Sequence, residues 1–130
     1  MFLTVIFSLF SYLHTYYFHY SKESASWWQY GYKEAVESTE QIKDQYNKVI
    51  IDKSIEQAYA FWLFYSKFDP KIYQTNFSKE NFDKYYFNNQ KSGDSKTLYV
   101  SAAKGFPQDY KLIKTIYYPD GTEVVKIGEK

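Results

Sequence analysis

The chain has 130 residues, enough for one domain with a buried core, and its 16 lysines and 15 acidic residues leave a net charge of only +1. This balance offers no basic field for nucleic acid, and the absence of cysteine excludes disulfides, thiolate metal sites and cysteine nucleophiles. No arginine is present, so any anion site must use lysine or backbone N–H groups.

The first twenty residues, 1–20, contain no Asp, Glu, Lys or Arg. About 20 mostly apolar residues are what a helix needs to span a bilayer. Aliphatic residues and Phe predominate up to Leu13, whereas Tyr16, Tyr17 and Tyr20 lie at the carboxyl end, as in an aromatic belt at the lipid head groups. We therefore expect residues 1–20 to be a transmembrane helix and residues 21–130 to form a domain outside the bilayer.

Two other interpretations of this segment are weaker. A cleaved signal peptide needs a basic region before its apolar run, but only Met1 precedes Phe2, and Ala25 is a poor cleavage position. A buried amphipathic helix of a soluble fold needs a polar face. The polar residues of the segment are instead few and scattered: Thr4, Ser8, Ser11, His14 and Thr15. The missing basic flank also leads us to expect that more chain precedes Met1.

A helix is predicted from Ser26, because Ser26 and Gln29 have the spacing of a capping box. Its core-facing stripe is expected to comprise Trp28, Tyr32, Ala35, Val36, Thr39, Ile42 and Lys43. Its solvated face is expected to comprise Glu34, Glu37, Glu40 and Asp44. None of these acids has the apolar setting that raises a pKa for general acid catalysis, so we interpret them as solubilising charges.

A buried strand and a second helix follow. The run KVIID, residues 48–52, is short, apolar and β-branched, and it predicts a buried strand. Ser54 and Gln57 repeat the capping-box spacing and predict a helix over residues 55–68, which Asp69 and Pro70 end. Its later turns are apolar nearly all round, so we expect it to pack between the sheet and a membrane face or partner domain. The order helix, strand, helix indicates a layered α/β unit.

The rest of the chain has the composition of strands. Residues 82–87 (FDKYYF) fit a strand or one helical turn, and residues 88–96 (NNQKSGDSK) fit a polar surface loop. Residues 97–103 (TLYVSAA) predict a core strand. Asp120-Gly121 lies between two further strand-like runs, 112–118 and 123–127, and indicates a β-hairpin. We therefore expect an α/β fold with a mixed sheet and a C-terminal hairpin.

Asp52 and Lys53 form the best ligand-binding position in the sequence. Asp52 closes the predicted buried strand and Lys53 follows it, and ligands collect at the carboxyl ends of strands in open α/β sheets. The simpler alternative, that Asp52 only caps or solvates the strand end, is the more common use of such a residue. The five glycines lack the spacing of a phosphate-binding loop, so no cofactor is expected, and no catalytic residue is predicted.

The aromatic residues near the start of the first helix are further candidates for binding. Trp27, Trp28, Tyr30 and Tyr32 could stack on sugar rings, although Trp28 and Tyr32 fit a core position better. This leaves Trp27 and Tyr30 as candidate ligand-binding residues.

The two histidines, His14 and His19, lie five residues apart in the apolar segment. They have no third ligand and no carboxylate nearby, so we predict no metal site and expect both rings to face the membrane interface.

Several blocks together resemble a known family. They are HYSKESASWWQYGYKEAVE after an apolar helix, YNKVIID, AYAFWLFYSKFDPKIYQ and GFPQDYKLIKTIYYPDGTEVVKIGE. In order and spacing they resemble the C-terminal part of bacterial family 39-like glycosyltransferases, membrane proteins related to polyprenyl-phosphate-mannose protein mannosyltransferases. The resemblance is weakest over residues 77–96.

The resemblance implies that residues 1–20 are the last of several transmembrane helices and that residues 21–130 form an extracytoplasmic domain at the cell membrane. The catalytic acids of that family lie in an outer loop that this sequence lacks, so none carries over. The implied role is accessory, beside a site that moves a sugar from a polyprenyl-phosphate donor to an extracytoplasmic acceptor. The implied partners are the bilayer, the rest of the transferase, the lipid-linked sugar and the acceptor. The alternative is a single-span glycan-binding or protein-interaction module.

Overall fold

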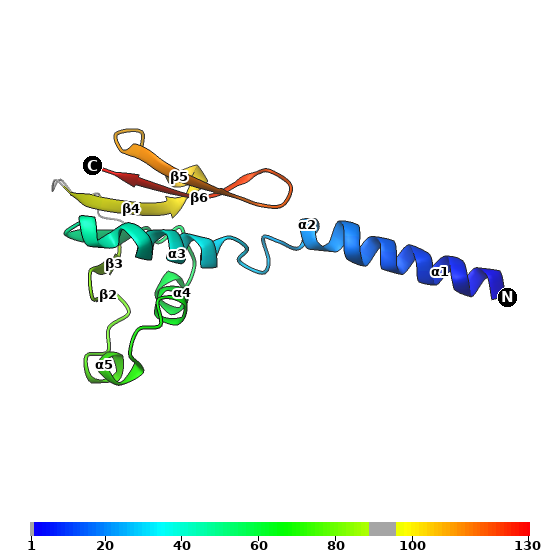
Figure 1. Cartoon of the computed structure of the whole chain (residues 1–130), viewed down its shortest axis with the longest axis horizontal. Coiled ribbons are helices and arrows are strands. Elements are labelled where there is room, and N and C mark those ends of the chain that lie inside the picture. Colours follow the sequence, from blue (N-terminus) through cyan, green and yellow to red (C-terminus); the bar gives the residue numbers. More distant parts are fainter. Residues whose placement is uncertain (1, 89–95) are drawn as a thin grey trace.

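The computed structural model describes residues 2–88 and 96–130 and has an α/β fold (Figure 1). Its centre is a six-stranded sheet of order β2-β3-β1-β4-β6-β5. The strands are β1 (Lys48–Ile51), β2 (Asn81–Phe82), β3 (Tyr85–Phe87), β4 (Thr97–Ala102), β5 (Lys111–Tyr117) and β6 (Glu123–Glu129). Strand β1 pairs parallel with β3 and β4, and the other neighbours are antiparallel. The predicted mixed sheet with a C-terminal hairpin is confirmed.

Helices α3 (Tyr32–Ile42) and α4 (Ala58–Tyr65) cover one face of the sheet. Alternate residues of β1 and β4 point into this layer, as the period of two in a strand requires. The main core consists of buried side chains from both helices and from the sheet, including Val36, Trp62, Val49, Ile51, Leu98, Val100 and Ile127. The run KVII is therefore a central buried strand, as predicted.

The opposite face of the sheet has a much smaller cover. Ile50 of β1 and Tyr99 of β4 are buried there beneath Tyr110, and Phe106 packs against them. Phe106 lies directly over Gly128 of β6, where a Cβ would clash with the phenylalanine ring. Only glycine allows so close an approach, which lets the segment after the 3-10 turn η3 (Ala103–Gly105) lie flat on the sheet.

The first predicted helix begins six residues later than expected, at Tyr32 instead of Ser26. The capping box does not form, because Gln29 and Gly31 adopt left-handed backbone angles, with φ of 47° and 90°. A Cβ at Gly31 would lie 3.0 Å from Cγ2 of Ile116, so contact with the hairpin fixes this turn. Trp28 consequently lies in a turn and is 71% exposed, and its predicted core position is wrong.

The second helix is also shorter than predicted. It spans Ala58–Tyr65 and begins after Gln57, whose φ of 52° is left-handed. Ser54 does not cap this helix, because its Oγ accepts a hydrogen bond from the backbone N–H of Ala102 at 3.1 Å. Asp69 and Pro70 were expected to stop the second helix. They instead begin α5 (Pro70–Thr75), which Asp69 caps by accepting a hydrogen bond from the N–H of Lys71.

The later strands largely follow the prediction. Residues 82–87 belong to two strands, β2 and β3, and residues 97–102 form the core strand β4. The hairpin of β5 and β6 turns at Gly121, whose φ is 87°, and Asp120 accepts hydrogen bonds from the N–H and the hydroxyl of Thr122. Residues 89–95 of the predicted polar loop lie outside the described residues.

One residue of the predicted solvated face, Glu40, is partly buried. Glu40 accepts a hydrogen bond from the hydroxyl of Tyr85 and forms an ion pair with Lys43 at 2.9 Å. Burial, together with this bond to Glu40, raises the pKa of Tyr85. Glu34, Glu37 and Asp44 are exposed as expected, and Glu34 and Asp44 form ion pairs with Lys114 and Lys84. Glu40 departs from the pattern because Tyr85 of β3 needs a partner for its buried hydroxyl.

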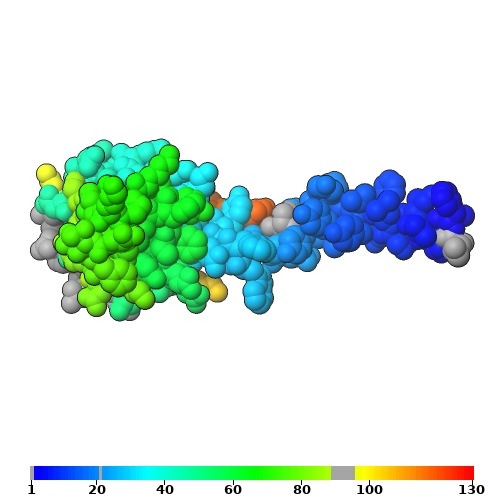
Figure 2. Space-filling view, turned by 90° about the horizontal axis from the view of Figure 1, so that it is seen from below, coloured from blue at the N-terminus to red at the C-terminus, as the bar shows by residue number. Residues whose placement is uncertain are grey.

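The N-terminal segment extends away from the domain (Figures 1 and 2). It consists of α1 (Phe2–His14), the π-helical η1 (Thr15–Tyr20) and the short α2 (Ser21–Glu23). No residue of α1 or η1 is buried. Within the described residues, no helix has both the length and the apolar character needed to cross a membrane.

Candidate functional site at the carboxyl edge of the sheet

The three parallel strands end at one edge of the sheet, on the side that faces the N-terminal helix (Figure 1). Asp52 and Lys53 follow β1 at this edge. The N–H of Asp52 donates to the carbonyl of Val100 on β4 at 2.8 Å, so the strand end is held in register. The structure thus places both predicted residues at the carboxyl edge of the parallel strands.

The side chain of Asp52 points to the less covered face of the sheet. Its Oδ2 accepts a hydrogen bond from the hydroxyl of Tyr99 at 2.6 Å, and its Oδ1 accepts one from the N–H of Ser54 at 2.8 Å. Burial alone raises the pKa of Asp52, but the bonds from Tyr99 and Ser54 outweigh it, and the pKa lies below its usual value. Burial and the bond to Asp52 raise the pKa of Tyr99.

This pairing determines what Asp52 can do chemically. A carboxylate whose pKa is lowered stays ionised at neutral pH and accepts hydrogen bonds. A general acid at neutral pH needs the opposite shift. Asp52 therefore joins the end of β1 to β4 and to the loop at Ser54, which is the capping use that the sequence left open as an alternative.

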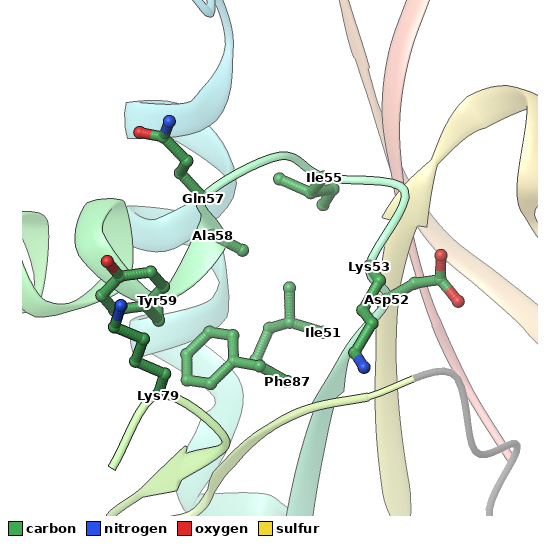
Figure 3. A pocket seen from close by; sticks show the side chains of 9 residues that line it. All are labelled: Ile51, Asp52, Lys53, Ile55, Gln57, Ala58, Tyr59, Lys79 and Phe87. Atoms are coloured by element: carbon green, nitrogen blue, oxygen red, sulfur yellow. The ribbon is translucent and has the colours of Figure 1, made fainter. Parts of the chain in front are cut away.

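Lys53 lies at a cavity of about 270 Å³ beside this strand end (Figure 3). The apolar part of the wall comprises Ile51, Ile55, Ala58 and Phe87, and the polar part comprises Asp52, Lys53, Gln57, Tyr59 and Lys79. In Figure 3 the carboxylate of Asp52 points away from the other lining side chains. The ammonium group of Lys79 lies 5.7 Å from the centre of the Tyr59 ring. The lining of the cavity thus combines apolar side chains with two lysines, Lys53 and Lys79.

Trp27 and Tyr30 do not line this cavity. They belong to residues 24–31, which we call the neck and which connects α2 to α3. Trp27 is 82% exposed, and the ring of Tyr30 lies 6.4 Å from that of Tyr118 in the hairpin. The four predicted binding residues therefore share one edge of the domain but form two separate places, and ligand binding at either stays a prediction.

Of the nine residues that line the cavity, sequence patterns selected only Asp52 and Lys53, and the seven others include Tyr59, Lys79 and Phe87. Phe87 ends β3, which is parallel to β1, so the rule that selected Asp52 would have selected it had the strand order been known. Tyr59 lies in an apolar helix whose pattern gives no preferred face, and Lys79 lies in a polar stretch without periodicity. Neither residue carries a local signal.

The two histidines remain in the N-terminal helix, with ring centres 5.2 Å apart. Within residues 2–88 and 96–130, no group of three or more His, Asp or Glu side chains could hold a metal ion. Comparisons with protein-family models, with curated proteins and with solved structures find no match to this chain.

Proposed function

We propose that this chain is a membrane-anchored, extracytoplasmic part of a glycosyltransferase at the cell membrane, with an accessory role in moving a sugar from a polyprenyl-phosphate donor to an acceptor. Residues 1–20 are its anchor and residues 21–130 its domain. The chemical step belongs to other parts of the transferase. The glycosyltransferase assignment rests on the resemblance of the sequence blocks, and the anchor rests on the structure of the N-terminal segment.

The observation that carries the anchor is the exposure of an uncharged apolar surface. Phe2, Leu3 and Phe7 are each at least 76% exposed, and other large apolar side chains of the segment are also exposed: Val5, Ile6, Leu9, Phe10, Tyr12, Leu13, Tyr16, Tyr17, Phe18 and Tyr20. So large a contiguous apolar surface is rare on soluble monomers and marks contact with a membrane or a partner. Helix α1 has 13 residues and η1 six, and none of these side chains is Asp, Glu or Lys.

Vesicle flotation of the full chain tests the anchor. The wild-type chain should float with phosphatidylcholine vesicles and stay with them after an alkaline wash. The double substitution Phe7→Lys and Phe10→Lys places two charges in the apolar segment and should leave most of the chain in the dense fractions. Control substitutions to lysine at two exposed domain residues, Ile72 and Phe77, should float like wild type. Equal flotation of both pairs, or no flotation of wild type, would overturn the anchor.

The coding DNA upstream of Met1 tests the glycosyltransferase assignment. We expect the reading frame to continue upstream through further apolar spans, with acidic residues in the first outer loop. An in-frame stop codon with a ribosome-binding site just before Met1 would falsify the assignment and leave the anchor untouched.

A second candidate function is favoured by one observation, the exposure of Trp27 and Trp28. Exposed aromatic rings can stack on sugars, so a single-span glycan-binding module would use such residues. A glycan array probed with the full chain in detergent separates the two functions. Strong binding to one glycan class that Trp27→Ala abolishes would favour the binding module over the accessory domain.

A further inference from the structure

The neck carries two neighbouring tryptophans that the fold leaves outside the core. Trp27 is 82% exposed and Trp28 is 71% exposed, whereas the third tryptophan of the chain, Trp62, is completely buried. Tyr30, also in the neck, is 47% exposed. Indole is the largest apolar side chain, and two such groups in water are a costly arrangement unless a partner covers them.

The backbone of the neck is held in place by hydrogen bonds. The N–H groups of Trp27 and Trp28 both donate to the carbonyl of Ser24, at 3.0 and 3.3 Å, and the N–H of Tyr30 donates to the carbonyl of Ala25 at 3.1 Å. Ala25 itself is buried. Gly31, at the end of the turn, lies so close to the hairpin that an added Cβ would be 3.0 Å from Cγ2 of Ile116. The indoles therefore point outward because of a defined turn.

The neck lies where the apolar helix meets the domain (Figures 1 and 2). Tyr16, Tyr17 and Tyr20, which precede it, are all about half exposed or more. Aromatic side chains are thus exposed both at the end of the uncharged helix and in the neck that follows it. Tryptophan and tyrosine are the residues enriched at the level of the lipid head groups, where one end of the ring is apolar and the other meets water.

The charges around the neck balance. Residues 21–34 contain two lysines and two glutamates, so this region has no net charge. Attraction to anionic lipids requires a cluster of basic residues. Any contact of the neck with a bilayer must therefore come from the aromatic rings, and it should need neither anionic lipid nor low salt.

We propose that Trp27 and Trp28 insert into the head-group layer of the bilayer and hold the carboxyl edge of the sheet, with Asp52 and Lys53, close to the lipid surface. This inference rests on the proposed anchor and adds a second point of membrane contact in the domain itself. With two points of contact, the domain has a fixed orientation on the membrane.

Tryptophan fluorescence of the full chain in phosphatidylcholine vesicles tests the proposal. The two variants are Trp62→Phe, in which only Trp27 and Trp28 emit, and the double substitution Trp27→Phe and Trp28→Phe, in which only Trp62 emits. We expect the Trp62→Phe chain to shift its emission to shorter wavelength on adding vesicles. Lipids brominated near the head group should quench it more than lipids brominated deep in the chains, and its quenching by aqueous iodide should fall severalfold.

The control variant and the lipid composition sharpen the test. Emission from the buried Trp62 should change little with vesicles, brominated lipid or iodide. If Trp62→Phe fails to fold, subtracting the emission of the double variant from that of wild type gives the same quantity. Vesicles with and without phosphatidylglycerol should give equal shifts, at low and at high salt.

The failures of the two proposals are distinguishable. A chain that does not bind vesicles contradicts the anchor and, with it, the neck contact. A chain that floats with vesicles while Trp27 and Trp28 keep full iodide quenching contradicts only the neck contact. Protection from iodide by a soluble glycan but not by vesicles would also overturn it, and would assign the tryptophans to sugar binding.

Discussion

Helices α1 and α4 are both mostly apolar and aromatic and contain no acidic or lysine side chain, but they have opposite surroundings. Helix α4 buries Ala58 and Trp62 against the sheet, whereas α1 buries no residue. The two differ in what neighbours them in the chain, because α4 lies between strands β1 and β3 and α1 precedes every strand. Apolar composition alone therefore does not distinguish a helix that packs in the core from a helix that the domain leaves exposed.

The largest effect should come from the buried side of α4. Trp62→Ala removes a completely buried ring that packs against Phe87, and it should lower the free energy of unfolding by about 3–5 kcal/mol. Phe64→Ala, in the same helix at 75% exposure, should change it by less than about 0.5 kcal/mol. Urea unfolding of the full chain in nonionic detergent, followed by far-UV circular dichroism, measures both. Similar costs for the two substitutions would contradict the core assignment.

An intermediate effect is expected at the junction between the two regions. Gly31→Ala combines a left-handed backbone with a Cβ 3.0 Å from Ile116, and should cost about 2–3 kcal/mol. Gly121→Ala has nearly the same φ but nothing within 4 Å, so it should cost only about 1 kcal/mol of backbone strain. The same unfolding measurement gives both losses of unfolding free energy. Equal losses would contradict the close packing of Gly31 against Ile116.

The smallest effect concerns Asp52. Its pKa is lower in the folded chain than in the unfolded one, so its charge stabilises the fold above the unfolded pKa of about 3.9 and this contribution disappears as the pH falls through the folded pKa. Asp52→Asn should therefore cost about 1 kcal/mol at pH 7, and the difference from wild type should shrink below about pH 4.

Tyr99→Phe removes the hydroxyl that donates to Asp52 and should reproduce much of this pH dependence. Urea midpoints measured between pH 7 and pH 3 check both variants. A difference from wild type that grows as the pH falls would contradict the direction of the pKa shift.

The strands were predictable because their signals are local. Apolar, β-branched composition predicts strands over residues 48–52 and 97–103, where β1 and β4 lie, and Asp120-Gly121 predicts the hairpin. The starts of α3 and α4 were not predictable. Ser26 and Ser54 have the spacing of a capping box, but contacts with distant residues determine the backbone there and neither serine caps its helix. Gly31 turns the chain against Ile116, and Ser54 accepts a hydrogen bond from Ala102. Such contacts with distant residues leave no local pattern.

The candidate site was likewise predictable only where a local sequence pattern marks it. Asp52 and Lys53 could be located because they directly follow a recognisable strand. Tyr59, Lys79 and Phe87 come together with them only through the parallel pairing of β1 with β3 and the return of the chain through α4 and α5. The exposure of Trp28 was likewise unpredictable, since it depends on where the helix begins.

Thiol labelling of the full chain in proteoliposomes tests most directly the proposal that the N-terminal segment lies in the membrane and the domain outside it. The chain has no cysteine, so Ser8→Cys in α1 and Lys33→Cys in α3 each provide a single site. Both positions are exposed in the protein itself. We predict that a membrane-impermeant maleimide labels Lys33→Cys rapidly and Ser8→Cys only after detergent is added. Equal labelling of the two sites in intact vesicles would contradict the account.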